Sequence, residues 1–389
     1  MGLCAVRLLE MRFLVWIVNR SGGPSIEEAS VTGLAGSDAN DIVRLGMLGA
    51  GFIAQVTHLN AFAELAGCSV AAIADNRALL RQDVARRHDI PQQFDGAAEL
   101  LALPAIDAFI VAMPRRAMAP ATLAALATGK PVLAEKPIAH TLEQGRRLVA
   151  AAKKSGSPFA VGFMKRHDPG VAHFREELRR LRASGEFGDI VHVGMRDYCA
   201  TYATPIPSHF RSAAPRPYRY DEWPTAPVWL APAQHNDYGV TVNVGSHDIN
   251  LLRYLFGGEL KAHKLRVRRQ GIQVATLDTG TFDIALEIGR VDTGRWEQSI
   301  DVYFRRGLLQ LLLPSPLARQ ETAQVSIVQG GRRETWAPPP DLRTWAFKAQ
   351  AAQFLDVVRG SAPPLASGLD ALGDLELIEN LWRCVDWSE

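Results

Sequence analysis

Lys136 is the first residue whose type and position suggest chemistry. It stands in Ala134-Glu135-Lys136-Pro137, directly after the apolar run Pro131-Val132-Leu133. That run predicts a short buried strand, and ligands of open parallel α/β sheets bind just outside the carboxyl ends of the strands. An ammonium group there could stabilise developing alkoxide charge, and partial burial would tune its pKa. The alternative is a surface lysine that happens to follow a strand.

His247 is the best candidate for proton transfer, because histidine titrates near the working pH of most enzymes. Asn243 lies four residues earlier, so the two side chains would share one face of a helix. Asp248 would point away from that face and is interpreted as structural, whereas Asn250 could share the face. The competing interpretation of His247 is a hydrogen-bonded histidine at the start of a helix.

A glycine-rich turn, Gly49-x-Gly51-x-x-Ala54, lies between a predicted strand and a predicted helix. Its first glycine allows a tight turn, and its second lets the backbone approach a pyrophosphate at the helix N-terminus. The small Ala54 permits close packing of the helix on the strand. The pattern predicts a dinucleotide site contacted by Gly49, Gly51, Phe52 and Ile53.

Asp75 ends the second predicted strand, where an acid would bind the adenosine ribose hydroxyls. A carboxylate favours NAD, because it would repel the 2′-phosphate of NADP. Arg77, two residues further on, could neutralise that phosphate. We therefore expect NAD as the cofactor, with NADP as the alternative.

Composition restricts the classes of function. The chain has 389 residues and a net charge of +2, which gives no electrostatic case for a nucleic acid or membrane partner. Its four cysteines have neither disulfide-framework nor zinc-site spacing, which favours a reducing, cytoplasmic location. No cluster of metal ligands is visible, so we expect no metal.

Residues 1–41 are interpreted as an extension that is disordered or begins at a non-native start. Residues 22–40 are rich in Gly, Ser and acidic residues. The apolar run at 13–18 is too short to span a membrane, and a targeting segment is the weaker alternative.

Strands alternate with helices from residue 42 to 163, which predicts βαβ units and a parallel sheet. The predicted strands are 42–48, 68–74, 105–112, 132–134 and 159–163, and the predicted helices are 55–66, 77–88, 119–128 and 142–154. Beyond residue 163 the pattern predicts helices at 171–182, 245–256, 345–359 and 369–385, and strands at 190–198, 264–268, 281–288, 297–303 and 308–313. These later strands lack helices between them and favour an antiparallel sheet.

Taken in order, the glycine turn, Glu135-Lys136-Pro137 and the segment around His247 resemble the glucose–fructose oxidoreductase, inositol dehydrogenase and rhizopine-catabolism (Gfo/Idh/MocA) family. The resemblance covers most of residues 42–385. It implies an α/β fold with an N-terminal Rossmann domain and a C-terminal α/β domain with an open, mostly antiparallel sheet. We expect the domains at 42–162 and 163–389, with the last helix packing back towards the first domain and the active site between them.

The resemblance also implies roles for individual residues. Lys136 would contact the nicotinamide ribose and the substrate hydroxyl, Glu135 would contribute to the cofactor site, and the Lys136–Pro137 bond would be cis. Asn243 stands where the family has an acid, so His247 would act with Lys136 alone, or the protein has lost dehydrogenase activity.

A second departure follows the third strand. Met113 and Pro114 would still pack against the nicotinamide or its ribose. Arg115 and Met118 replace the usual Asn and His of the family, and Arg115 could reach a phosphate or a substrate, or remain solvated.

Substrate contacts are expected from Arg166 and from a long loop over 199–237, next to Tyr198. That loop carries aromatic and multi-donor side chains suited to a polyol, namely Tyr202, Arg211, His235, Asn236, Asp237 and Tyr238. The competing use of the loop is in oligomer formation.

Together these features predict an NAD(P)-dependent oxidoreductase acting on a secondary carbinol or ketone of a sugar, cyclitol or glycoside. One alternative is a keto-sugar reductase of modified-sugar biosynthesis, and another is a non-catalytic dinucleotide-binding sensor. We expect a homodimer or homotetramer.

Overall fold

The structure is a computed structural model that describes residues 42–199, 202, 204–212, 222–257, 260–268, 271–291 and 293–386. The extension predicted over residues 1–41 lies outside these residues, as does part of the predicted loop over 199–237.

A six-stranded parallel sheet forms the first half of the described chain, with strand order β3-β2-β1-β4-β5-β6. The strands are β1 (Val43–Leu48), β2 (Cys68–Ala74), β3 (Gln92–Phe94), β4 (Ala108–Val111), β5 (Val132–Ala134) and β6 (Phe159–Val161). Every residue of β4, β5 and β6 is buried, as expected for a parallel sheet covered by helices on both faces. The predicted Rossmann arrangement is confirmed.

The helices of this half follow the strands in turn. A π-helical segment (Ala54–His58) continues into α1 (Leu59–Ala63), followed by α2 (Ala78–Arg87), α3 (Ala97–Leu101), α4 (Arg115–Leu126) and α5 (Leu142–Ser155). Helix α4 begins at Arg115, earlier than predicted, and contains Pro120. Because proline has no backbone N–H, the Arg116 carbonyl is left available and accepts a hydrogen bond from the Trp223 amide instead (3.1 Å).

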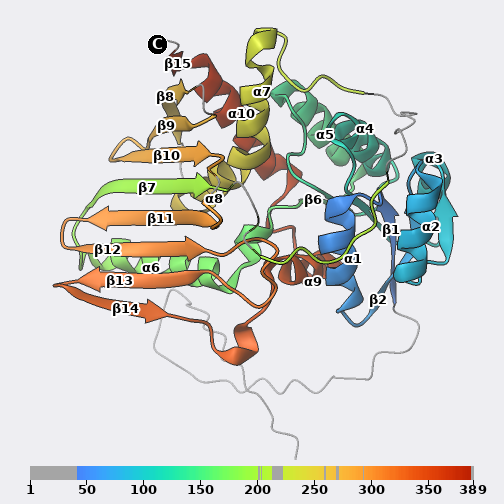
Figure 1. Cartoon of the computed structure of the whole chain (residues 1–389), viewed down its shortest axis with the longest axis horizontal. Helices are drawn as coiled ribbons and strands as arrows, with labels where there is room; N and C mark the ends of the chain where they lie inside the picture. Colours follow the sequence, from blue (N-terminus) through green and yellow to red (C-terminus); the bar gives the residue numbers. More distant parts are fainter. Residues whose placement is uncertain are drawn as a thin grey trace, which may run out of the picture. The chain divides into compact units, whose positions relative to one another are not determined.

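A nine-stranded sheet dominates the second half, with order β14-β13-β12-β11-β7-β10-β9-β8-β15 (Figure 1). Its strands are β7 (Ile190–Tyr198), β8 (Lys261–Val267), β9 (Gln273–Asp278), β10 (Asp283–Gly289), β11 (Glu297–Phe304), β12 (Gly307–Leu313), β13 (Gln324–Gln329), β14 (Arg332–Trp336) and β15 (Val385–Asp386). Only the β7–β10 and β8–β15 pairs are parallel, so the prediction of a mostly antiparallel sheet is confirmed.

Burial along these strands alternates. In β11, Ile300 and Val302 are fully buried, whereas Tyr303 is 45% exposed. One face of the sheet therefore packs on the core and the other faces outward. The sequence pattern misses β3 and β14, which are edge strands with mostly polar side chains, and it also misses β9 and β13.

The helices of this half are α6 (Pro169–Ser184), α7 (His235–Val240), α8 (Ser246–Phe256), α9 (Ala346–Val358) and α10 (Gly368–Arg383). A short 3-10 helix (Met164–His167) precedes α6, and a π-helical segment (Thr241–Gly245) joins α7 to α8. Further 3-10 turns lie at Pro232–Gln234 and Pro340–Leu342. Helix α6 lies behind β12 and β13 in Figure 1. The loop predicted over 199–237 ends earlier than expected, because helix α7 starts at His235.

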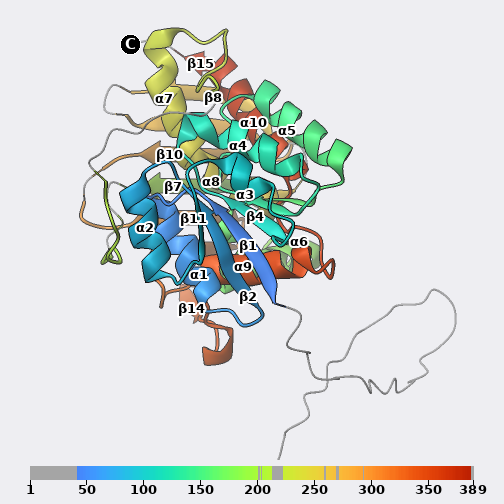
Figure 2. The ribbon, with the colours of Figure 1, turned by 90° about the vertical axis from the view of Figure 1, so that its right-hand side faces the viewer.

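The last helices return to the first sheet. Helix α9 packs against α1, and α10 packs against both α5 and α8 (Figure 2). The amide of Val161 in β6 donates to the Ala366 carbonyl (2.9 Å), just before α10 begins. Further along α10, the Glu379 carboxylate accepts a hydrogen bond from the amide of Leu142, the first residue of α5 (2.7 Å). These contacts hold the parallel sheet against the second half of the chain.

Candidate active site

A cavity of about 540 Å³ lies beyond the carboxyl ends of β1, β2, β4, β5 and β6, within the usual range for ligand pockets. Most of the predicted site residues line it: Gly49, Gly51, Phe52, Ile53, Asp75, Arg77, Met113, Pro114, Glu135, Lys136, Asn243 and His247. The first ten come from the parallel sheet and the last two from the second half of the chain. The fold thus brings together residues that are more than a hundred positions apart.

The glycine turn has the shape that a pyrophosphate needs. Gly49 has φ of +101°, and a Cβ there would lie 2.3 Å from the Ala112 carbonyl oxygen, so no larger residue fits. A Cβ on Gly51 would instead meet only the Arg77 guanidinium, at 4.0 Å, and would project towards the cavity that Gly51 lines. The bare backbone at Gly51 leaves space for a ligand to approach, and the turn therefore fits a dinucleotide.

Asp75 and Arg77 form an ion pair at the end of β2. Arg77 donates from Nε to Oδ1 (2.9 Å) and from Nη2 to Oδ2 (2.7 Å) of the buried Asp75 carboxylate. The Ala50 amide, in the glycine turn, donates to the same carboxylate (2.9 Å). Burial acts to raise the pKa of Asp75, but the hydrogen bonds from Arg77 and Ala50 outweigh it and lower the pKa below its ordinary value.

Met113 and Pro114 follow β4 and line the cavity, as do Arg115 and Met118 from the first turns of α4. Met118 is 7% exposed and belongs to the core under α4. The structure therefore gives the Met118 side chain an apolar packing role beside the cavity, whereas Arg115 brings a positive charge to it.

Lys136 connects the two halves of the chain. Its Nζ donates a hydrogen bond to the backbone carbonyl of Asn243 (2.7 Å), and the Lys136–Pro137 bond is cis. Beneath it, a Glu135 oxygen lies 2.8 Å from the buried His58 Nε2. Burial lowers the pKa of Lys136 to about 8, with Glu135 opposing the shift and Lys165 and Arg115 adding to it.

His247 faces the cavity from the first turn of α8, with the Phe163 ring packed edge-on at 6.0 Å. Its Nδ1 atom is buried and makes no hydrogen bond with the part of the chain that is described. Burial lowers the pKa of His247 well below its ordinary value, and the positive charges of Lys136 and Lys165 act in the same direction. The imidazole is therefore neutral at physiological pH and has a lone pair with which to accept a proton.

A buried polar cluster that the sequence reasoning missed completes the cavity. Lys165, Asp197 and Cys199 line it, and behind them the Gln298 side-chain amide donates to Asp248 (2.6 Å) and to Asp197 (3.1 Å). The ammonium of Lys165 lies 4.0 Å from the Asp248 carboxylate. Asp197 lies near the carboxyl end of the strand predicted over 190–198. A polar residue at a strand end is the signal that identified Lys136, and the same signal could have identified Asp197.

Asp248 itself is fully buried and does not line the cavity. Burial raises its pKa well above the ordinary value, and Asp197 adds to the shift while Lys165 opposes it. The protonated form of Asp248 is therefore favoured. This placement agrees with its interpretation as a structural residue rather than a second acid in the cavity.

Aromatic side chains also line the cavity. Tyr202 stacks on Trp296 with ring centroids 6.1 Å apart and contacts Phe52 of the glycine turn at 6.0 Å. Arg290 lines the cavity as well. Of the side chains named in the predicted loop, Tyr202 alone lines the cavity among those that the structure describes. The fully buried Tyr238 instead donates to the His140 carbonyl (2.7 Å).

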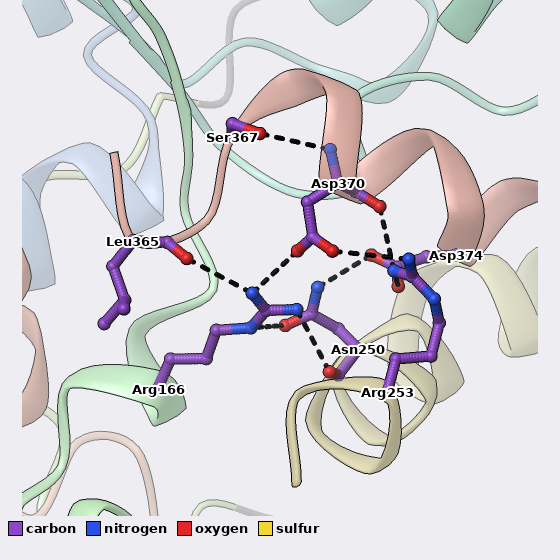
Figure 3. A network of polar contacts seen from close by, with 7 residues as sticks. All are labelled: Arg166, Asn250, Arg253, Leu365, Ser367, Asp370 and Asp374. Atoms are coloured by element: carbon purple, nitrogen blue, oxygen red, sulfur yellow. Dashed lines mark hydrogen bonds and ion pairs between the residues drawn. The ribbon is translucent and has the colours of Figure 1, made fainter. Parts of the chain in front are cut away.

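The structure does not place Arg166 at the cavity. Its side chain is 4% exposed and pairs with Asp370 (2.6 Å), while its Nε donates to the Asn250 side chain (2.6 Å), as Figure 3 shows. Asn250 in turn donates to Asp374 (2.8 Å), so it does not share the cavity with His247. Arg166 is therefore held away from the cavity, because the half-buried Asp370 of α10 pairs with its charge.

Tyr198 also lies outside the cavity. Its hydroxyl donates to Glu287 (2.5 Å) on the neighbouring strand β10. Successive residues of a strand point to opposite faces, so Tyr198 faces away from the side on which Asp197 reaches the cavity. The expected substrate contact of Tyr198 is therefore not seen.

No group of three or more His, Cys, Asp or Glu side chains able to hold a metal ion occurs in the described ranges. Within the same residues, no helix has the length and apolar character needed to cross a membrane.

Gly51 gives a direct test of the dinucleotide site. We expect Gly51→Val to weaken binding of NADH and NADPH at least tenfold, because its side chain would occupy the space that the pyrophosphate needs. Fluorescence titration measures this binding without a substrate.

Gly96→Val is the matched control, because a side chain at Gly96 also meets open space but lies outside the cavity. It should leave the affinity unchanged and the protein folded, which a melting curve checks. Wild-type affinity in Gly51→Val would contradict the placement of the pyrophosphate.

Comparison with known proteins agrees with this geometry. The family model described as "Oxidoreductase family, NAD-binding Rossmann fold" matches residues 43–163, and the GFO/IDH/MocA C-terminal domain matches residues 176–309. The rhizopine catabolism protein MocA of Rhizobium meliloti is 24% identical over 86% of this chain and 93% of its own length. Inositol 2-dehydrogenase of Paracoccus denitrificans is 32% identical over 43% of this chain and half (50%) of its own length.

Solved structures share the fold. KijD10, a 3-ketoreductase from Actinomadura kijaniata in complex with TDP-benzene and NADP, has a TM-score of 0.70 at 21% identity, over 88% of this chain and 98% of that protein. The WlbA dehydrogenase from Bordetella pertussis, in complex with NADH and UDP-GlcNAcA, has a TM-score of 0.65 at 18% identity, over 90% and 96%. With both domain models matched in order over well over half of its length, the chain belongs to the Gfo/Idh/MocA family of NAD-binding oxidoreductases.

Proposed function

We propose that this oxidoreductase moves a hydride between nicotinamide C4 and a secondary carbinol or ketone carbon of a sugar, cyclitol or glycoside. One observation carries the proposal: an ammonium from the first domain and a neutral imidazole from the second face the same cavity as the dinucleotide turn. Oxidation of a carbinol releases a hydride and a proton. The imidazole can accept the proton, and the ammonium can stabilise the charge on the oxygen.

The bound dinucleotide supplies the acceptor or donor of the hydride, and the protein manages the oxygen and its proton. In the oxidative direction His247 accepts the hydroxyl proton, which its low pKa allows because the imidazole is unprotonated at neutral pH. In the reductive direction the same atom returns the proton to the developing alkoxide.

Lys136 stabilises the negative charge that develops on the reacting oxygen. Its hydrogen bond to the Asn243 carbonyl fixes the direction of the ammonium. Because this contact uses the backbone, it does not depend on the side chain at position 243. The Asn243 side chain is therefore available to hydrogen-bond a substrate hydroxyl, although it cannot tune His247 by charge.

The rest of the cavity supports a polyhydroxylated substrate. Lys165 and Asp197 supply a donor and an acceptor beside His247, and the Tyr202–Trp296 stack offers flat apolar faces for the C–H edges of a ring. The curated relatives that act on inositol are in keeping with this class. Reduction of a keto-sugar uses the same groups in the opposite direction.

The sequence also left open a non-catalytic sensor. The convergence of Lys136 and His247 on one cavity favours an enzyme, because a sensor has no need of an acid–base pair at the nicotinamide end. Turnover separates the two functions. Purified protein with NAD or NADP and a panel of inositols, aldoses, keto-sugars and glycosides should change absorbance at the reduced-nicotinamide band, whereas failure of the whole panel would favour the sensor.

Removal of either group should slow the chemical step strongly but should not prevent cofactor binding. We expect Lys136→Ala and His247→Ala to lower kcat by about 10²-fold or more, the usual effect of losing a positioned acid–base group. The affinity for NADPH or NADH should stay within a few-fold of wild type.

Lys154→Ala, which changes an exposed lysine of α5, is the matched control and should have wild-type kcat. Full activity in either cavity variant would rule out the mechanism.

The pH dependence of kcat/KM for oxidation follows from the two pKa shifts. His247 must be neutral to accept a proton. Its pKa lies well below the ordinary value of 6.5, so the imidazole is already neutral at pH 6.5 and stays neutral at higher pH. Lys136 must be charged, and it loses its proton as the pH rises through about 8. We therefore expect a plateau around neutral pH and a decline above pH about 8, measured by initial rates.

Lys136→Arg keeps the positive charge to higher pH, so the variant should be slower but should lack the decline above pH 8. A wild-type rate that rises through pH 8 would instead mean that neutral Lys136 is the base.

We also propose that the chain forms a homo-oligomer through the outward face of its large sheet. On this face Tyr303, Leu312 and Val274 are 45%, 41% and 40% exposed, although they are apolar or aromatic. Light scattering coupled to gel filtration should give a dimer or tetramer. Tyr303→Glu with Leu312→Glu should shift it towards monomer, and a monomeric wild type would contradict the proposal.

A further inference from the structure

The carboxylate expected to bind the adenosine ribose has no acceptor capacity left. Asp75 Oδ1 accepts from the Arg77 amide (3.0 Å) and Nε (2.9 Å), and Oδ2 accepts from Arg77 Nη2 (2.7 Å) and the Ala50 amide (2.9 Å). An ionised carboxylate offers about four lone-pair sites, so these donors fill them. A ribose diol could be accepted by Asp75 only if Arg77 moved away.

Arg77 is costly to displace. The side chains of Asp75 and Arg77 are only 7% and 10% exposed. Removing one partner from a buried ion pair leaves an uncompensated charge in a poorly solvated place, which is strongly unfavourable. The Asp75 backbone is held as well, because its carbonyl accepts from Arg81 (2.5 Å), which in turn pairs with Asp95 (2.5 Å). Binding of a ribose diol to Asp75 would therefore have to offset the cost of breaking this ion pair.

The guanidinium of Arg77 stands next to the phosphate-binding turn. Arg77 lines the cavity, and its Nη2 lies 4.0 Å from the position that a Cβ of Gly51 would occupy. It also precedes the first residue of α2, where a helix N-terminus favours negative charge. A planar guanidinium held in one orientation is the side chain best suited to a phosphate group.

We infer that Arg77 makes this enzyme prefer NADP(H), with Asp75 acting as the anchor of Arg77 and not as the acceptor of the ribose hydroxyls. This inference reverses the preference that the sequence suggests, because Arg77 neutralises the carboxylate that would repel a 2′-phosphate. It rests on the dinucleotide site of the proposed function but not on the proposed substrate.

The test is equilibrium binding, which needs no substrate. Tryptophan fluorescence of the full chain is titrated with NADPH and NADH, and with the fragments 2′,5′-ADP and 5′-AMP. We expect wild type to bind NADPH at least tenfold more tightly than NADH, and 2′,5′-ADP more tightly than 5′-AMP. This preference should weaken with added salt, as an ionic contact does.

Arg77→Ala and Arg77→Gln should each reduce the ratio of NADPH to NADH affinity at least tenfold, with NADH binding kept or improved as Asp75 becomes available. Arg77→Gln retains a donor for Asp75 and so guards against loss of folding, which the melting temperature checks. Arg77→Lys should keep part of the preference. Arg86→Ala, at an exposed arginine on the same helix, is the matched control and should leave the ratio unchanged.

A wild type that binds NADH as tightly as NADPH or more tightly would overturn the inference. So would an unchanged ratio in folded Arg77→Ala and Arg77→Gln. Neither result would bear on the proposed hydride chemistry, since Lys136 and His247 act at the other end of the dinucleotide. Conversely, a failed substrate panel would leave this binding test intact.

Discussion

The hydrogen bond from Lys136 Nζ to the Asn243 carbonyl (2.7 Å) is the contact on which the site depends. It joins the carboxyl end of a parallel strand to the π-helical segment before α8, and so joins the two halves of the cavity. A lysine held in this way cannot swing into solvent, and its burial lowers its pKa to about 8. The same bond lies close to His247, whose imidazole is kept neutral partly by the ammonium charge.

That contact requires the two halves to be held in a fixed relation, and α10 provides it. The helix packs against α5 of the first domain and α8 of the second. Its acids Asp370 and Asp374 bind Arg166, Asn250 and Arg253 in a partly buried polar network (Figure 3). Such a network tolerates little displacement, because breaking it would leave the buried charges of Arg166 and Asp374 without partners. Arg166 therefore holds α8, which carries His247, against α10, and its side chain does not line the cavity.

Charge balance explains how so many ionisable groups share one cavity. The ammonium groups of Lys136 and Lys165 face an imidazole that is neutral, and Asp248 behind them favours its protonated form. Gln298 donates to both Asp197 and Asp248 and so holds the two acids together. At the adenosine end, Arg77 and Asp75 neutralise each other in the same way.

The sequence by itself determined the local structure and the dinucleotide turn. Strand and helix periodicity gave the alternating elements of the first domain, and glycine chemistry at Gly49 and Gly51 is local, because it depends on one turn between β1 and the following helix. The lysine after β5 and the histidine on α8 were also found, since strand ends and helix faces can be read from neighbouring residues. Only the tertiary structure decided that Arg166 binds the acids of α10, and that Asp197 reaches the cavity while Tyr198 does not. Periodicity gives the face on which a side chain lies, but the partner of a charge depends on which distant elements the fold packs against that face.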